Sequence, residues 1–275
     1  MKKIVCLFFV LTSIGMFSQE VNDKATNKGK VFLYWGWNRG FYSNSDINFK
    51  GNDYNFTLNN ATASDKPTPF SVNDYLNPAN MTIPQTNYRI GYFFKENYSI
   101  SIGVDHMKYV LDQHQMASIS GEIDGVYAPH NGVYNGGLKE VEAGFVQFEH
   151  TDGLNYVSVE VSRFDDISSF FHLHSKNFQI NATEGVGLGF LLPRTNTTLF
   201  DKERYDEFHL SGFGVSGRVG LDFTFFKYFF MMPELKGGYI NMGDIRTTQS
   251  KSDSASQSFW YVEPTIVFGG RFKIF

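Results

Sequence analysis

The chain has 275 residues, a formal net charge of −4, and 17% aromatic residues, among them 29 Phe and 15 Tyr. Its acidic balance argues against a nucleic-acid partner, because nucleic-acid binding normally needs a basic patch. The single cysteine, Cys6, lies close to the N-terminus, which excludes a disulfide framework, a thiolate metal site and a thiol nucleophile from the rest of the chain.

The N-terminal residues have the pattern of a secretory signal. Lys2 and Lys3 precede an apolar run of about a dozen residues, and small or polar residues follow near Ser18. The apolar run is too short for a membrane-spanning helix, which needs roughly 20 residues. We predict a cleaved signal peptide over residues 1–18 and a polar leader over residues 19–29.

The first predicted strand begins at Lys30. Val31, Leu33, Trp35 and Trp37 alternate with other side chains and therefore share one face. The tryptophans suit the aromatic girdle at a membrane interface. Residues 43–84 then turn polar and proline-rich, with a predicted small hairpin around residues 51–52. Connections of this length tend to be functional or to hold structure of their own.

A hairpin with a tight turn follows over residues 88–104. Apolar residues alternate with a second set that includes Arg89 and Asp105. The middle of the chain alternates less clearly. Residues 113–123 predict a strand or a strand extension above the membrane, residues 124–137 a loop, and residues 141–148 and 156–162 two strands. Residues 163–177 predict a connection with one helical turn.

The last third alternates clearly again. Residues 178–192 predict a strand, residues 193–206 a charged loop, and residues 207–243 a long hairpin that turns at Lys227 and Tyr228. One face of this hairpin is aliphatic and aromatic, while the other carries small residues and charges of both signs. A polar loop over residues 247–258 precedes the last strand, which begins near Trp260.

This distribution of polarity is typical of a membrane-spanning barrel, which is apolar toward lipid and polar toward its lumen. We predict an all-β fold, a transmembrane antiparallel up-and-down β-barrel of about ten strands, with twelve as the alternative, over residues 30–275. Long loops lie on the extracellular side of such barrels and short turns on the periplasmic side. The predicted extracellular loops are residues 43–84, 124–137, 193–206 and 247–258.

The chain as a whole resembles bacterial outer-membrane β-barrel proteins. The signal peptide, the alternating strands with aromatic ends, the contrast of short turns and long loops, and the terminal Phe275 carry this resemblance. It implies a place in the outer membrane of a Gram-negative cell, contact with outer-membrane lipids and lipopolysaccharide, and insertion by the outer-membrane barrel assembly machinery. One departure concerns Phe275, which shares its parity with Arg271 and Lys273 instead of the apolar residues of its strand.

Charged residues of both signs fall on the predicted lumen face. A barrel of about ten strands is narrow, so we expect these charges to pair and fill it, although a small solute channel is an alternative. The predicted lumen charges are Arg89, Asp105, Glu160, Arg218, Asp222, Glu234 and Lys236.

His209 and Ser211 are the most suggestive catalytic pair, because residues two apart on a strand project to the same side. The pair resembles one found in small-barrel lipid A deacylases, which use a glutamate as the third member. Glu184 interrupts the apolar face of the preceding strand, and a β-bulge at residues 183–185 would turn it inward. The expected register places Glu184 several residues too deep for a triad.

Two other histidine motifs have simpler interpretations. His172 and His174 lie in a connection and lack the further ligands that a metal site needs. His150 and Asp152 are interpreted as part of a turn instead of an acid–base pair.

The sequence therefore favours a non-enzymatic membrane barrel whose outer loops serve a structural or binding role, with no cofactor and no metal. The ligand of these loops is not specified by any motif. The alternatives are a lipid-modifying hydrolase that uses His209 and Ser211, and a small solute channel.

Overall fold

The computed structural model describes residues 26–80, 83–125, 127–175, 177–200 and 202–273. The predicted signal peptide, most of the leader and the terminal Phe275 lie outside these residues. Among the described residues, no helix has the length and hydropathy needed to cross a membrane.

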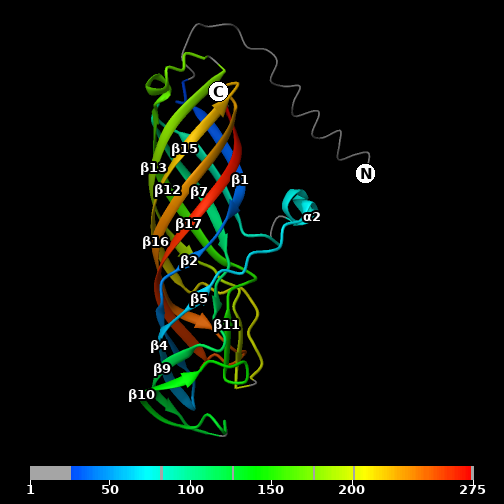
Figure 1. Ribbon diagram of the computed structural model, residues 1–275, viewed down its shortest axis with the longest axis vertical. Helices are drawn as coiled ribbons and strands as arrows, with labels where there is room; N and C mark the ends of the chain where they lie inside the picture. Colours follow the sequence, from blue (N-terminus) through cyan, green and yellow to red (C-terminus); the bar gives the residue numbers. More distant parts are fainter. Residues whose placement is uncertain (1–25, 81–82, 126, 176, 201, 274–275) are drawn as a thin grey trace.

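Antiparallel strands form a closed ring in the order in which they occur in the chain (Figure 1). The ring strands are β1 (Lys30–Asn38), β6 (Thr86–Phe93), β7 (Tyr98–Met107), β12 (Leu154–Asp166), β13 (Phe178–Leu191), β15 (Gly212–Phe225), β16 (Phe229–Arg246) and β17 (Ser254–Lys273). The last strand pairs with the first over the whole of β1, from Lys30 opposite Lys273 to Asn38 opposite Thr265. The prediction of an antiparallel up-and-down barrel is confirmed.

The two faces of the ring are divided as the alternation predicts. On β1, Phe32 and Tyr34 are buried inside while Leu33 is 55% exposed outside. On β16, Glu234 and Lys236 are buried inside and Leu235 is half exposed outside. An apolar outer face around a polar, buried interior is the arrangement of a transmembrane barrel.

The ring has eight strands, so the expected number of about ten is too high. An eight-stranded barrel has an interior that side chains can fill completely. The segments that raised the expected number do form strands, but these lie beyond one end of the ring. Its other end, the turn end, carries the short turns, the 3₁₀ helix η3 (Ser168–Phe171) and the last described residue, Lys273.

The long connections fold into a second body, here called the outer domain (Figure 1). Four strands continue the sheet from the far part of β17, and four shorter strands form a second sheet. The first set is β3 (Ser45–Lys50), β4 (Tyr54–Ala61), β9 (Met116–Ile123) and β10 (Gly132–Glu140); the second is β14 (Asn196–Leu199), β11 (Val146–Glu149), β8 (Val110–Leu111) and β5 (Ala63–Ser64). The two-residue strand β2 (Phe41–Tyr42) pairs with β17.

The outer domain has its own apolar core of buried residues. Phe49 and Phe56 stack with ring centroids 5.3 Å apart. Phe148, on β11 of the second sheet, packs against Phe49, and Phe145, just before β11, packs against Phe56. Aromatic pairs of this kind contribute stability beyond the area they bury. The predicted hairpin around residues 51–52 is confirmed as β3–β4, and the 113–123 segment is confirmed as a strand extension beyond the ring.

The polarity of β17 inverts along its length, which locates the boundary between the two bodies. Near its start, buried Ala255 and Phe259 face inward and Ser256 faces outward; from Trp260 onward the outward residues are apolar, and inward Glu263 is fully buried. Because an apolar outer face is suited to lipid and a polar one to water, the membrane boundary lies near Trp260.

Several predicted segments differ from the structure, among them the predicted loop over residues 193–206, which contains β14. The predicted loop over residues 124–137 contains the start of β10, and the predicted strand over residues 141–148 is reduced to β11. The predicted loop over residues 247–258 contains the start of β17. β10 is exposed on both of its faces and lacks the period-two alternation of a half-buried strand. β11 does alternate, but over only four residues, which is a weak signal.

Candidate functional site

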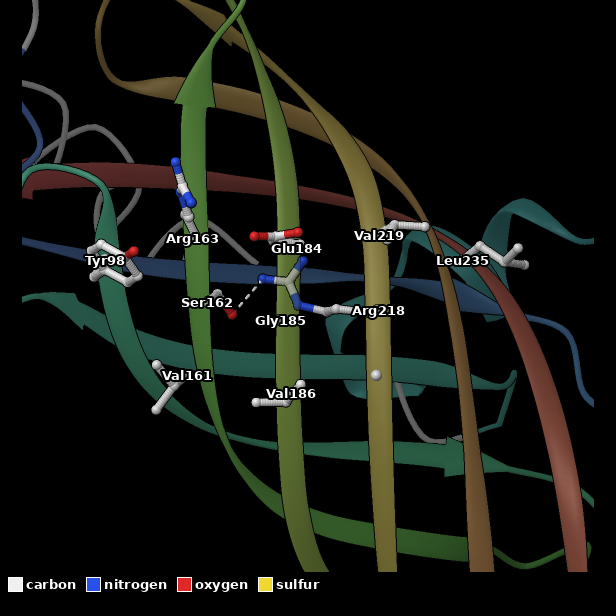
Figure 2. Close-up of a pocket in the computed structure, with 11 residues that line it drawn as sticks. Tyr98, Val161, Ser162, Arg163, Glu184, Gly185, Val186, Arg218, Val219 and Leu235 are labelled. Atoms are coloured by element: carbon white, nitrogen blue, oxygen red, sulfur yellow. Dashed lines mark hydrogen bonds between the residues drawn. The ribbon is translucent and has the colours of Figure 1, made fainter.

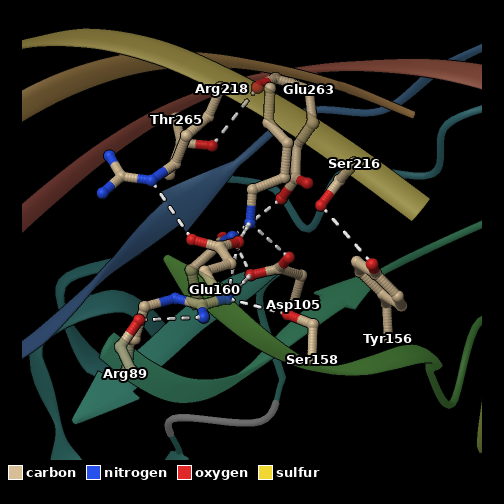
Figure 3. Close-up of polar contacts among 12 residues, drawn as sticks. Arg89, Asp105, Tyr156, Ser158, Glu160, Ser216, Arg218, Glu263 and Thr265 are labelled. Carbon is tan, nitrogen blue, oxygen red and sulfur yellow. Dashed lines mark hydrogen bonds and ion pairs between the residues drawn. The ribbon is translucent and has the colours of Figure 1, made fainter. Parts of the chain in front are cut away.

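Charged side chains from six ring strands converge in the interior of the barrel (Figure 3). Glu160 on β12 is their hub: its carboxylate lies 3.0 Å from Arg89 Nη2, 2.8 Å from Lys236 Nζ and 3.1 Å from Arg218 Nε. Asp105 lies 2.6 Å from Lys236 Nζ. The side chains of this group are only 1–3% exposed. Each charge is balanced by an oppositely charged side chain, because a buried charge is tolerated only when it is paired.

The predicted lumen charges are therefore confirmed as inward-facing and paired. Arg218 also pairs with Glu234, and Asp222 pairs with Arg271 nearer the turn end. Glu263 was not among the predicted lumen charges, but it is fully buried and accepts a hydrogen bond of 2.8 Å from Asn87 Nδ2. Its signal was present, because Glu263 alternates with the outward Val262 and Pro264.

Aromatic side chains fill the interior at the turn end. This group, the turn-end plug, packs around the guanidinium of Arg271, which lies 4.7 Å from the ring centroid of Phe230 and 5.4 Å from those of Phe93 and Phe164. Cation–π contacts of this kind stabilise a desolvated cation. The plug consists of Phe32, Tyr34, Phe93, Phe164, Phe230, Met232 and Val267.

The interior is thus occupied from end to end. The turn-end plug, the ion cluster and the core of the outer domain follow one another along the barrel, and their side chains are buried. A solute channel needs a solvated path through these layers. The arrangement favours the expectation that interior charges pair and fill the barrel over the alternative of a channel.

His209, Ser211 and Glu184 do not converge. His209 Nε2 lies 3.0 Å from Asp244 Oδ2, while the hydroxyl of Ser211 donates to the backbone carbonyl of His209. Ser211 N bonds to Leu191 O, seven residues along β13 from Glu184. At about 3.3 Å per residue, the carboxylate is roughly 20 Å from the serine. The carboxylate partner of His209 is therefore Asp244 and not Glu184.

The β-bulge considered for residues 183–185 is absent. Glu184 pairs in regular register with Arg163 on β12 and Val219 on β15, and its side chain lies on the outer face of the ring. It lines an outer groove of about 600 Å³ with Tyr98 and Arg163 (Figure 2). Arg163 also lies 2.8 Å from Asp165, so this rim of the ring carries an exposed polar group beside apolar side chains.

His150 and Asp152 do not form an acid–base pair. No group of three or more His, Cys, Asp or Glu side chains suited to a metal occurs in the described part of the chain. His150 is fully buried in the outer domain, with Nδ1 3.0 Å from Thr195 Oγ1 and Nε2 3.2 Å from Gln257 Nε2. Asp152 instead accepts a hydrogen bond from Asn196. Residues 151–152 form a turn, which confirms that interpretation of the motif.

Burial lowers the pKa of His150 to about 3. No carboxylate contacts the ring to offset the loss of solvation, so the folded domain holds the imidazole neutral.

A shallow polar pocket of about 400 Å³ lies on the outside of the outer domain, next to the membrane boundary. Asp46 is the one ionisable residue among those that line it. Asn48 Nδ2 donates to Thr57 Oγ1 at 3.1 Å, and so joins two of the strands beneath the pocket. The polar side chains here called the polar face are Asp46, Asn48, Thr57, Asn241, Ser256 and Ser258.

An aromatic pair borders the polar face. Trp260 follows Ser258 by two residues and therefore lies on the same side of β17; it is 64% exposed. Its ring centroid is 5.2 Å from that of Tyr239. No sequence motif identifies this face, because most of its polar residues lie in segments that resemble loops.

Comparison with known proteins yields likeness of structure only. No known family profile and no curated protein sequence matches the chain. The outer membrane protein OprG from Pseudomonas aeruginosa superposes with a TM-score of 0.42 at 9% identity over 91% of this chain and 99% of that one. The outer membrane protein AlkL superposes with a TM-score of 0.42 at 14% identity, over 94% of this chain and 97% of that one. Ail of Yersinia pestis superposes with a TM-score of 0.33 at 12% identity, over 89% of this chain and 99% of that one. The assignment as a transmembrane barrel rests on the chain's own ring and polarity.

Glu160→Gln is expected to destabilise the barrel by about 3–5 kcal/mol, because it leaves three buried cations without their shared anion. Urea unfolding of the protein in lipid vesicles measures this change. Glu184→Gln is the matched control, since it removes a carboxylate from the outer face, and little or no loss is expected. Equal effects of the two substitutions would contradict a hub role for Glu160.

The stability of the outer domain is expected to fall at acid pH. The pKa of His150 is lower in the folded than in the unfolded chain. The neutral imidazole therefore contributes its full stabilisation to the free energy of unfolding above about pH 6.5, and this stabilisation is lost as the pH falls toward 3. The loss is about 1.4 kcal/mol per pH unit. His150→Asn should reduce this dependence in denaturant unfolding at pH 7 and pH 4. An unchanged slope in His150→Asn would refute the assignment.

Proposed function

We propose that the chain is an integral outer-membrane protein whose barrel anchors the outer domain at the cell surface, where the polar face binds glycans. One observation carries the proposal: a pocket of neutral amides and hydroxyls lies beside an exposed tryptophan on a folded, well-packed domain. The filled interior supports a role at the surface over one in transport.

The chemistry of the polar face suits sugar hydroxyls. Amide and hydroxyl groups both donate and accept hydrogen bonds, as sugar hydroxyls do, and the single carboxylate of Asp46 adds a strong acceptor. Aromatic rings such as Trp260 offer an apolar surface for the C–H face of a sugar. The strands beneath the pocket are paired with one another, which holds these groups in place before a ligand arrives.

Two sources of such a ligand are compatible with this position. One is a glycan on another cell or in solution, and the other is the saccharide part of the glycolipids that surround the barrel in its own membrane. Both present neutral hydroxyl-rich surfaces to the polar face. The experiment below separates them by its two arms.

The test measures binding of the protein in phospholipid nanodiscs to an array of neutral oligosaccharides, and in parallel to purified lipopolysaccharide. We expect binding in at least one arm, and about a tenfold loss in Ser256→Tyr, whose side chain would fill the pocket; a tenfold loss corresponds to about 1.4 kcal/mol. Ser64→Tyr, at an exposed position on β5 of the second sheet and not among the residues that line the pocket, is the matched control. Failure of both arms, or equal loss in both variants, would refute the proposal.

The hydrolase alternative has one supporting contact, the hydrogen bond between His209 and Asp244. Activation of Ser211 needs its hydroxyl to donate to the imidazole, but the hydroxyl is bonded to a backbone carbonyl. We therefore expect cells that produce the wild-type protein and the Ser211→Ala variant to have the same lipid A and phospholipids by mass spectrometry. A lipid change that depends on Ser211 would establish the hydrolase instead.

A further inference from the structure

The segment between the outer domain and β6 exposes a group of apolar side chains. This side segment, residues 65–80 and 83–84, contains α2 (Val72–Leu76) and the 3₁₀ helix η2 (Pro78–Asn80). Phe70 is 76% exposed, Val72 65%, Leu76 56% and Ile83 44%. Isolated exposed apolar residues are ordinary, but a group of them within one short segment marks a contact surface.

The side segment is held in a defined conformation. Ser71 caps α2, because its hydroxyl accepts a 3.0 Å hydrogen bond from the backbone N–H of Asp74. Lys108 Nζ donates to Thr68 Oγ1 at 2.9 Å and to the carbonyl of Ile83 at 2.8 Å, which ties the two ends of the segment together. The apolar side chains are thus presented outward by a fixed backbone.

The side segment is also fixed against the barrel wall. Tyr75 is the buried residue of α2, and its ring centroid lies 5.9 Å from that of Trp37 on β1. Trp37 in turn lies 6.0 Å from Phe268, which belongs to the apolar outer face of β17. Figure 1 shows α2 beside the barrel, at the level of β1, and away from the outer domain's far end. The exposed apolar group is therefore continuous with the apolar belt of the ring.

The continuity with the apolar belt indicates what covers these exposed side chains. From the exposed side chains, the position beside the belt and the tryptophans near the boundary, we infer that the side segment inserts Phe70, Val72, Leu76 and Ile83 among lipid acyl chains. The leaflet concerned is the one that faces the outer domain. The segment lies in the interface, because a short helix flanked by irregular backbone keeps polar groups that the hydrocarbon interior does not tolerate. It serves as a second membrane anchor, and this role does not depend on the glycan site.

The experiment places a nitroxide label on single cysteines and measures its collisions with oxygen, which enters lipid, and with a water-soluble nickel chelate. The mature chain is expected to lack cysteine, so no background substitution is needed. Leu76→Cys and Val72→Cys lie on one side of α2. Lys50→Cys, at an exposed position on β3 of the outer domain, is the control in water. The protein is folded into phosphatidylcholine vesicles.

We expect the labels at positions 72 and 76 to lose their collisions with the nickel chelate and to keep those with oxygen, while the label at position 50 keeps both. Strong nickel collisions at positions 72 and 76 would place the segment in water and overturn the inference. Spin–spin broadening that increases with protein density would show a second copy as the occupant, and would overturn it as well. Because these side chains are exposed, the substitutions leave the fold intact, which the heat-dependent gel mobility of the barrel verifies.

Discussion

Closure of the ring by β17 and β1 is the constraint on which the rest of the structure depends. A lipid environment offers no hydrogen-bond partner to the backbone, so a sheet that spans a membrane has to pair its last strand with its first. Here the two strands pair over all nine residues of β1, from Lys30 to Asn38. Eight strands close a narrow ring, and the narrowness decides what the interior can contain.

That narrow interior explains the ion cluster. The inward positions of Glu160, Lys236 and Arg218 are too few and too close together to enclose a solvated path, so each charge has its partner in another side chain. A buried pair of this kind adds little net stability compared with apolar packing, but loss of one partner is costly. The cluster therefore fixes which strands face one another more than it adds to the total stability.

The sequence predicted the ring far better than the outer domain, for a physical reason. In the ring each residue faces either lipid or the interior, so Arg89 and Ile90, or Leu235 and Lys236, differ sharply in polarity. In the outer domain β10 is exposed on both faces and shows no such contrast.

The pairing of distant segments was beyond the reach of local pattern. The pairings of β11 with β14 and of β17 with β3 join segments far apart in the chain. The local sequence of these strands does not indicate which strand each one pairs with. The alternation of the strands predicted the members of the ion cluster except Glu263, which lies on a strand whose clearest pattern is its apolar outward face. The polar face depends entirely on these distant pairings.

The 20 residues of β17 pass without interruption from the ring into the outer domain. A continuous strand has no hinge, so the two bodies form one mechanical unit, unlike domains joined by a flexible linker. A force applied to the outer domain is carried along β17 as shear on its ladders with β16 and β1, where many hydrogen bonds resist it together. Such an attachment suits a protein that has to keep hold of something outside a cell while the membrane moves beneath it.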